Sequence, residues 1–148
     1  MTKTFASWLK KHREILCALG INLLFLLICR CFSHMQFGTN DDRDISNLLA
    51  NVYGGEDGYY IAFVNVFLCK ALAALYKITN NAANWYVIIS VGVSFISLAT
   101  ASYILMHRAK RFPAGAALTI IFVGALCESH YIVFQFTQNL SLIHISEP

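Results

Sequence analysis

The segment Asn40-Asp41-Asp42-Arg43-Asp44 places three carboxylates and a guanidinium within five consecutive residues. Two adjacent aspartates could hold a divalent metal ion through their oxygens. Alternatively, one could act as a general base, helped by the like charge of its neighbour. The plainer interpretation is a hydrated loop in which one aspartate caps a helix. On composition alone the loop is favoured, because acidic residues collect in loops outside a membrane.

Two further groups of ionisable residues could act together with the aspartates. Glu128 and His130 are costly within a membrane unless they face a cavity or the interface, so they either line the same outer cleft or mark a helix end. They supply only two metal ligands, and no third residue has the spacing that a metal site requires. Arg43 and Lys70 could bind a phosphate group, or could extend their side chains to the membrane interface.

The composition indicates what kind of scaffold must position these residues. Of the 148 residues, 57% are hydrophobic and 13% are charged, against about 45–50% and about 25% in soluble domains. The mean hydropathy is +0.58. Such a chain cannot bury its apolar surface in a core of its own, so we expect a membrane protein in contact with lipid. The net charge of +3 lies beside apolar runs and not on a polar domain, which argues against nucleic-acid binding.

The cysteines and the N-terminus also fit a membrane protein. Five cysteines lie within or beside apolar runs and lack CxxC spacing, which favours small apolar membrane residues over a disulfide framework. The basic N-terminus leads into an apolar run that is long enough to span and has no small-residue cleavage site after it, unlike a signal peptide. The cysteines are Cys17, Cys29, Cys31, Cys69 and Cys127.

Three apolar runs are sufficient to cross a ~30 Å hydrocarbon core, which takes about 20 helical residues: residues 15–32, 84–106 and 113–128. The first contains one polar side chain, Asn22, for which we expect a hydrogen bond between helices. The predicted fold class is therefore all-α, a polytopic membrane protein with about three spanning helices. Residues 33–83 form a large outer loop with interfacial helices.

Within that loop, the sequence predicts a short helix on the membrane surface. Four apolar residues follow the i, i+3, i+4, i+7 spacing of one helix face: Ile45, Leu48, Leu49 and Val52. Asp44 is placed to cap the start of this helix, and Gly54-Gly55 to end it. Elsewhere, six aromatic residues favour an interfacial belt over platforms for stacking sugars: Tyr59, Tyr60, Trp85, Tyr86, Tyr131 and Phe134.

Residues 59–78 decide the predicted topology. If they span the membrane, the basic residues 107–111 lie outside, against the positive-inside rule. If they lie in the interface or re-enter, residues 107–111 and the basic N-terminus are both cytoplasmic. Lys70 within a full span would also cost about 2.5–3.5 kcal/mol. We therefore favour a multi-pass cell-membrane protein with a cytoplasmic N-terminus.

The last nine residues, LSLIHISEP at positions 140–148, resemble the translation of a transposon-end adapter used to prepare DNA sequencing libraries. We therefore expect residues 140–148 to be a non-native tail and exclude them from functional reasoning. Residues 1–139 are then expected to be the N-terminal part of a larger protein, and inactive without the remainder.

Six short motifs follow one another along residues 10–139. They are Asn40-Asp41-Asp42, Tyr53-Gly54-Gly55, FVNVFL at 63–68, ALYKI at 74–78, NWY at 84–86 and FQFTQ at 134–138. Together they resemble the GT-C class of integral-membrane glycosyltransferases. Within that class they are similar to polytopic proteins of Gram-positive bacteria that open with an "NDD" loop.

The resemblance implies an enzyme with many membrane helices that transfers a sugar from a polyprenyl-phosphate donor to a cell-envelope acceptor on the outer face. It places Asp41 or Asp42 in the catalytic role, as a base or in positioning a divalent metal ion. From the residues themselves, the substrate-binding candidates are Arg43, Lys70, Glu128 and His130. Two other functions stay open: a transporter or flippase of lipid-linked saccharides, and a non-catalytic membrane protein. The sequence assigns neither the sugar, the acceptor nor the oligomeric state.

Overall fold

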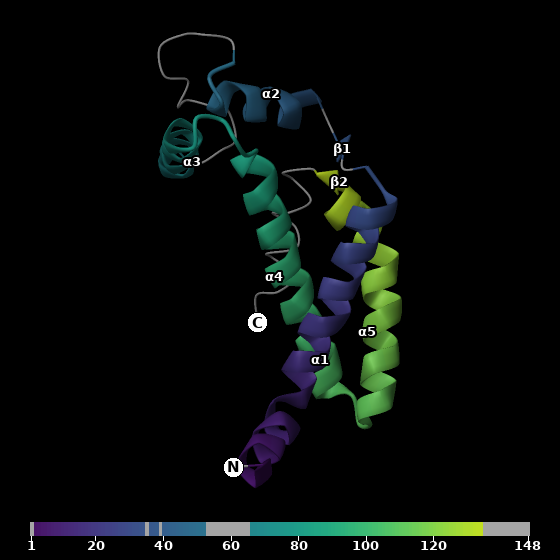
Figure 1. The fold of residues 1–148 in the computed structure, drawn as a ribbon. Helices are drawn as coiled ribbons and strands as arrows, with labels where there is room; N and C mark the ends of the chain where they lie inside the picture. Colours follow the sequence, from purple (N-terminus) through teal and green to yellow (C-terminus); the bar gives the residue numbers. More distant parts are fainter. Residues whose placement is uncertain (1, 35, 39, 53–65, 135–148) are drawn as a thin grey trace.

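The computed structural model describes residues 2–34, 36–38, 40–52 and 66–134, and most of them are helical (Figure 1). The predicted all-α class is confirmed, with one addition: two very short parallel strands. The elements are α1 (Thr2–Phe32), β1 (Gln36–Phe37), α2 (Asn40–Leu49), α3 (Val66–Ile78), α4 (Trp85–Arg108), α5 (Phe112–Cys127), the π-helical turn η1 (Glu128–Ile132) and β2 (Val133–Phe134).

Three helices of the described chain are long and apolar enough to cross a membrane: His12–Phe32, Trp85–Arg108 and Phe112–Ile132. They coincide closely with the predicted spans. The largest difference is at the end of the third, which continues beyond residue 128 because η1 prolongs α5 by a wider turn. The first span is the apolar part of α1, whose helix runs unbroken from Thr2.

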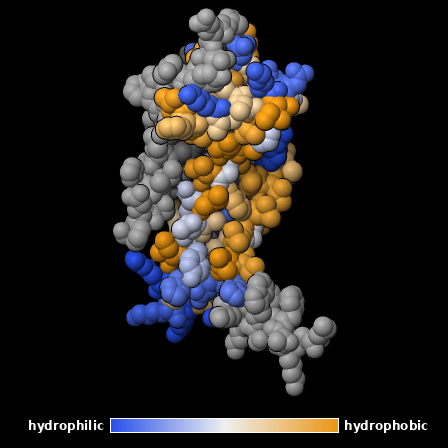
Figure 2. Space-filling model, turned by 90° about the vertical axis from the view of Figure 1, so that its left-hand side faces the viewer, coloured by the Kyte–Doolittle hydropathy of each residue, from blue (hydrophilic) through white to orange (hydrophobic). Residues whose placement is uncertain are grey.

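These three helices pack side by side with alternating directions, so that α1 and α5 run one way and α4 the other (Figure 1). Their shared core contains the apolar side chains of Leu98, Val123 and Tyr131. On the face shown in Figure 2, apolar side chains cover the middle of the bundle between two more hydrophilic ends. The exposed apolar residues of the bundle include Leu24 and Ile121. An apolar belt of this kind is stable only against lipid.

A polar cluster lies in the middle of the bundle and joins its helices. Nδ2 of Asn22 donates to Oγ of Ser102 over 3.0 Å and to the carbonyl of Ala18 over 2.9 Å. The hydroxyl of Tyr131 donates to Oδ1 of Asn22 over 3.1 Å. The prediction that Asn22 forms hydrogen bonds between helices is confirmed.

Both basic clusters lie at the same end of the bundle, where α1 enters it and α4 turns into α5 (Figure 1). Nδ1 of His107 lies 3.1 Å from Oε2 of Glu14, and the guanidinium of Arg13 lies 4.8 Å from the ring centroid of Phe112. The turn itself is tight, because Gly115 packs directly against the backbone of Met106. This arrangement agrees with the predicted topology in which residues 59–78 do not span.

Helix α3 covers the second half of that segment and lies across the opposite end of the bundle. In Figure 1 it is seen end-on while α4 and α5 run lengthwise. Its 13 residues extend roughly 20 Å at 1.5 Å per residue, too short for a ~30 Å hydrocarbon core. Lys70 is exposed on it. Residues 59–65 lie outside the described residues.

The remaining contacts at this end come from the strands. β1 and β2 pair in parallel, with Gln36 opposite Val133 and Phe37 opposite Phe134. The pair joins the chain leaving α1 to the chain leaving η1, and brings the start of α2 over the bundle. All five cysteines are free thiols.

Candidate functional site

The aspartates of the NDDRD segment lie on helix α2, which begins at Asn40. Asp41 and Asp42 occupy its first turn, where negative side chains interact favourably with the helix dipole. The prediction that Asp44 caps the helix start is wrong, because Asp44 lies inside the helix with an exposed side chain. The two preceding acids already suit a helix N-terminus, so the helix starts one turn earlier than expected.

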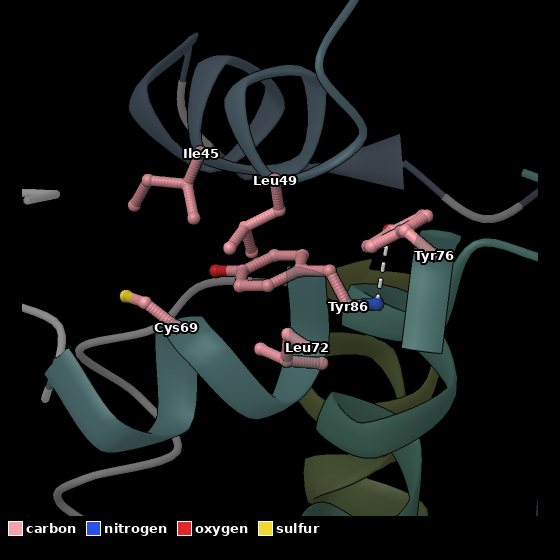
Figure 3. Close-up of a cluster of buried hydrophobic side chains, with 6 residues drawn as sticks. All are labelled: Ile45, Leu49, Cys69, Leu72, Tyr76 and Tyr86. Atoms are coloured by element: carbon pink, nitrogen blue, oxygen red, sulfur yellow. Dashed lines mark hydrogen bonds between the residues drawn. The ribbon is translucent and has the colours of Figure 1, made fainter. Parts of the chain in front are cut away.

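The predicted apolar face of α2 is partly correct. Ile45 and Leu49 are buried against α3 and the ring of Tyr86 (Figure 3). Leu48 is 41% exposed and Val52 is 63% exposed, so these two residues do not belong to the packed face. The reason is that α2 contacts its neighbours through a narrow i, i+4 stripe and ends before Val52.

Helix α2 ends at Leu49 and not near Gly54-Gly55, which lie outside the described residues. Asn51 adopts a left-handed conformation with φ of 54°, which asparagine tolerates in place of the usual glycine. Nδ2 of Asn81, in the turn after α3, donates to the carbonyl of Ala50 over 3.1 Å. The end of α2 is therefore tied to the end of α3.

Asp42 is the buried member of the acidic pair. Its side chain is 2% exposed, and Oδ1 accepts a hydrogen bond of 2.7 Å from the hydroxyl of Tyr86, at the start of α4. The aromatic-belt prediction is therefore wrong for Tyr86, and also for Tyr131, because both are buried. Tyr59 and Tyr60 of the same prediction lie outside the described residues.

A second hydrogen-bonded group lies beside this pair and was missed at the level of sequence. Oδ1 of Asn84 accepts from the hydroxyl of Tyr76 over 2.6 Å, from the hydroxyl of Ser46 over 3.3 Å and from the amide of Val87 over 3.1 Å. The amide of Tyr86 donates to the hydroxyl of Tyr76 over 3.1 Å (Figure 3). Asn84 thus caps α4 and joins α2, α3 and α4.

Three of the six sequence motifs meet at this junction. The NDD motif supplies Asp42, the ALYKI motif supplies Tyr76, and the NWY motif supplies Asn84 and Tyr86. The three motifs are far apart along the chain, so the sequence does not show that they meet. The one signal that could have suggested it is that each is a short motif with polar or aromatic residues beside an apolar run. Within the described part of the chain, the predicted aspartates meet polar partners from other motifs at this junction.

The junction holds two aspartates in different environments. Asp42 has one carboxylate oxygen fixed by Tyr86, so its orientation is set. Asp41, its neighbour in the first turn, is exposed, as is Arg43. Chemically, an exposed carboxylate on a fixed helix can accept a proton from a bound hydroxyl group, and an exposed guanidinium can bind a phosphate.

The other predicted site residues do not join the acidic pair through any hydrogen bond or ion pair that the structure shows. Lys70 is exposed on α3. Glu128 is exposed on η1, at the same end of the bundle as α2 (Figure 1). His130, also on η1, is buried, and its Nδ1 has no hydrogen-bond partner. Their roles in substrate binding stay predictions.

The predicted divalent metal site at Asp41 and Asp42 gains no third His, Cys, Asp or Glu ligand from the described residues. Among the described residues, no group of three or more His, Cys, Asp or Glu side chains is placed to hold a metal ion. One oxygen of Asp42 is already bonded to Tyr86, whereas Ca²⁺ needs six to eight oxygens and Mg²⁺ needs six. The acidic pair alone does not fit such an ion, so no metal is assigned to it.

These features define a membrane protein with a polar junction at one end of a helical bundle. No protein-family model matches the chain, and no curated protein or solved structure matches it either.

Proposed function

We propose that this chain is the N-terminal part of a membrane glycosyltransferase that moves a sugar from a polyprenyl-phosphate donor to a cell-envelope acceptor. The observation that supports the proposal is the unequal pair at the start of α2. Asp42 is buried and fixed by Tyr86, while Asp41 beside it is exposed. The pair lies at the end of the bundle opposite the basic clusters (Figure 1).

In the proposed reaction, Asp41 is the catalytic residue and Asp42 is a positioning residue. The Asp41 carboxylate accepts the proton of an acceptor hydroxyl as that oxygen attacks the anomeric carbon of the donor sugar. The bond between this carbon and the phosphate oxygen breaks, and the polyprenyl phosphate leaves with its electron pair. Arg43 would stabilise the phosphate through its fork of N–H donors.

The proposed orientation places this reaction outside the cell. All three candidate spans cross the membrane, and the basic end faces the cytoplasm according to the positive-inside rule. Helix α2 then lies at the depth of the lipid headgroups on the outer face, which is where the phosphate of a polyprenyl donor is found.

The main rival is a transporter or flippase of lipid-linked saccharides. That function calls for ionisable groups deep within the spans. In the described residues, the buried polar cluster at the middle of the bundle consists of uncharged groups, around Asn22, Ser102 and Thr119. This observation supports the enzyme over the transporter.

The test is sugar transfer by membrane vesicles that contain the product of the whole gene, supplied with polyprenyl-phosphate [¹⁴C]glucose and with the envelope glycan as acceptor. We expect Asp41→Asn to lower the transfer rate by about 10²–10⁴-fold. Asp44→Asn is the matched control, because it changes another exposed aspartate of α2, and should keep the wild-type rate. Equal rates in Asp41→Asn and wild type would refute the proposed base. Movement of the labelled lipid across the vesicle without transfer would favour the flippase.

A further inference from the structure

The basic end of the bundle carries a group of cations that is not neutralised within the described chain. Four exposed basic residues come together there from three elements, and they are Arg13, Arg108, Lys110 and Arg111. The sequence separates Arg13 from the others, and the packing of α1 against α4 and α5 brings them to one end (Figure 1).

The acid nearest to these cations is already engaged. Oε2 of Glu14 lies 3.1 Å from Nδ1 of His107, and the ring of His107 stacks on Tyr103 with centroids 5.7 Å apart. None of the four cations takes part in an ion pair shown within the described residues, so these basic groups keep their charge exposed.

One cation is also held in position. The guanidinium of Arg13 lies 4.8 Å from the ring centroid of Phe112, an arrangement in which the ring attracts the charge without using its N–H donors. These donors stay free to face a phosphate at the edge of the bundle. The cations also begin where the apolar belt ends (Figure 2), which is the depth of lipid phosphates in a bilayer.

The opposite end differs in charge. Four exposed cations at that end, Arg30, Arg43, Lys70 and Lys77, are accompanied by the exposed acids Asp41, Asp44 and Glu128. An anionic headgroup would meet both cations and carboxylates at that end. At the basic end it would meet the four cations. The two ends of the bundle therefore differ in the charge that they present to a lipid headgroup.

We propose that the basic end formed by Arg13, Arg108, Lys110 and Arg111 binds the headgroup of an anionic glycerophospholipid. The phosphate accepts hydrogen bonds from the guanidinium groups and Lys110, while the acyl chains lie along the apolar belt. Each cation near an anionic membrane surface contributes about fivefold to the affinity. This inference does not depend on the proposed glycosyltransferase function.

The experiment uses the purified chain in dodecyl maltoside, a neutral detergent, and measures Tm during addition of dioleoyl-phosphatidylglycerol or dioleoyl-phosphatidylcholine. We expect phosphatidylglycerol to raise the Tm and phosphatidylcholine to leave it unchanged. Glycerol 3-phosphate, which has the same phosphate without acyl chains, should also leave it unchanged. About 1 M NaCl should abolish the effect of phosphatidylglycerol, because it reduces the Debye length to ~3 Å.

The variant Arg108→Gln/Lys110→Gln should need about 25-fold more phosphatidylglycerol for the same rise in Tm, at about fivefold for each cation. The matched control Arg30→Gln/Lys77→Gln removes the same charge from the opposite end and should respond like wild type. Equal responses to the two lipids, or equal weakening in both variants, would overturn the proposal. If the first variant does not fold, the comparison of lipids and the effect of salt on wild type still decide it.

Discussion

The hydroxyl of Tyr86 donates a hydrogen bond to Oδ1 of Asp42 over 2.7 Å, although the two residues are 44 positions apart. One belongs to the first turn of α4 and the other to the first turn of α2, so the bond fixes the acidic pair to a spanning helix. Tyr86→Phe should lower the free energy of unfolding by about 1–3 kcal/mol, because the buried carboxylate loses the hydrogen bond from this hydroxyl.

Chemical denaturation of the purified protein in detergent measures this change. Tyr103→Phe is the control, since Tyr103 is exposed and its hydroxyl has no hydrogen-bond partner in the described residues. An unfolding free energy of Tyr86→Phe equal to that of the control would contradict the role of this bond.

The polar cluster in the bundle should contribute to its stability. Asn22→Ala removes the acceptor of Tyr131 and the donor to Ser102, and should cost about 1–3 kcal/mol. Thr100→Ala is the comparison, because the Thr100 hydroxyl bonds only to the carbonyl of Ile96 in its own helix and is exposed. We expect that variant to change stability by less than about 0.5 kcal/mol. Thermal unfolding of both variants measures this difference. Similar losses of stability in the two variants would contradict a stabilising role for the polar cluster.

The first turn of helix α5 should not tolerate a side chain at Gly115. A Cβ there would lie 3.1 Å from Cα and 3.3 Å from the carbonyl oxygen of Met106, and backbone atoms cannot move aside easily. Gly115→Ala should therefore destabilise the protein by about 1–3 kcal/mol. Gly92→Ala meets nothing within 4 Å and should stabilise α4 by about 0.5–1 kcal/mol. The two Tm values should move in opposite directions, and a fall in both would disprove this account.

The packing of α1 against α5 can be tested with native cysteines. Cys127, near the end of α5, packs against the buried cluster that contains Cys29 of α1. Oxidation by copper phenanthroline should join them, with two protons and two electrons lost to the oxidant. Mass spectrometry of peptides should then find Cys29 linked to Cys127 and not to Cys69, which lies in a different cluster. A product with Cys29 unlinked would indicate a different packing.

The proposed orientation predicts opposite accessibility for the two ends of the bundle. In a background without native cysteines, a membrane-impermeant maleimide should label Asn80→Cys from outside the cell and should not label Lys110→Cys. Both positions are exposed, and both should react once the membrane is permeabilised. Labelling of Lys110→Cys alone would reverse the orientation, and labelling of both in intact cells would rule out a three-span bundle.

The spans could be predicted from sequence because lipid requires long apolar runs, and residues 84–106 satisfy that requirement without any tertiary information. The same holds for Asn22, since a single amide within such a run has few partners other than another helix. The start of α2 could not be placed, because Asp41, Asp42 and Asp44 are all good residues near a helix N-terminus. The position of the helix start depends on how α2 packs against α3 and α4.

The hydrogen bonds of the junction could not be predicted from local sequence patterns. Nothing near Asp42 indicates Tyr86 as its donor, and nothing near Asn84 indicates that it accepts from both Tyr76 and Ser46. Such bonds depend on how two helices are placed by the rest of the chain. The wider turn of η1, which carries the buried His130 and Tyr131, has no sequence signal that local propensity would reveal.

The pairing of β1 with β2 has a consequence for biosynthesis. Gln36 cannot find Val133 until the third span has been synthesised, on the order of 5–20 s later at ordinary translation rates. Asp42 must likewise wait for Tyr86. A ribosome-bound chain that has inserted only its first helix therefore exposes the NDDRD segment without its final partners. The acidic pair can take its native arrangement only after the start of α4 has been synthesised, because Tyr86 belongs to that helix.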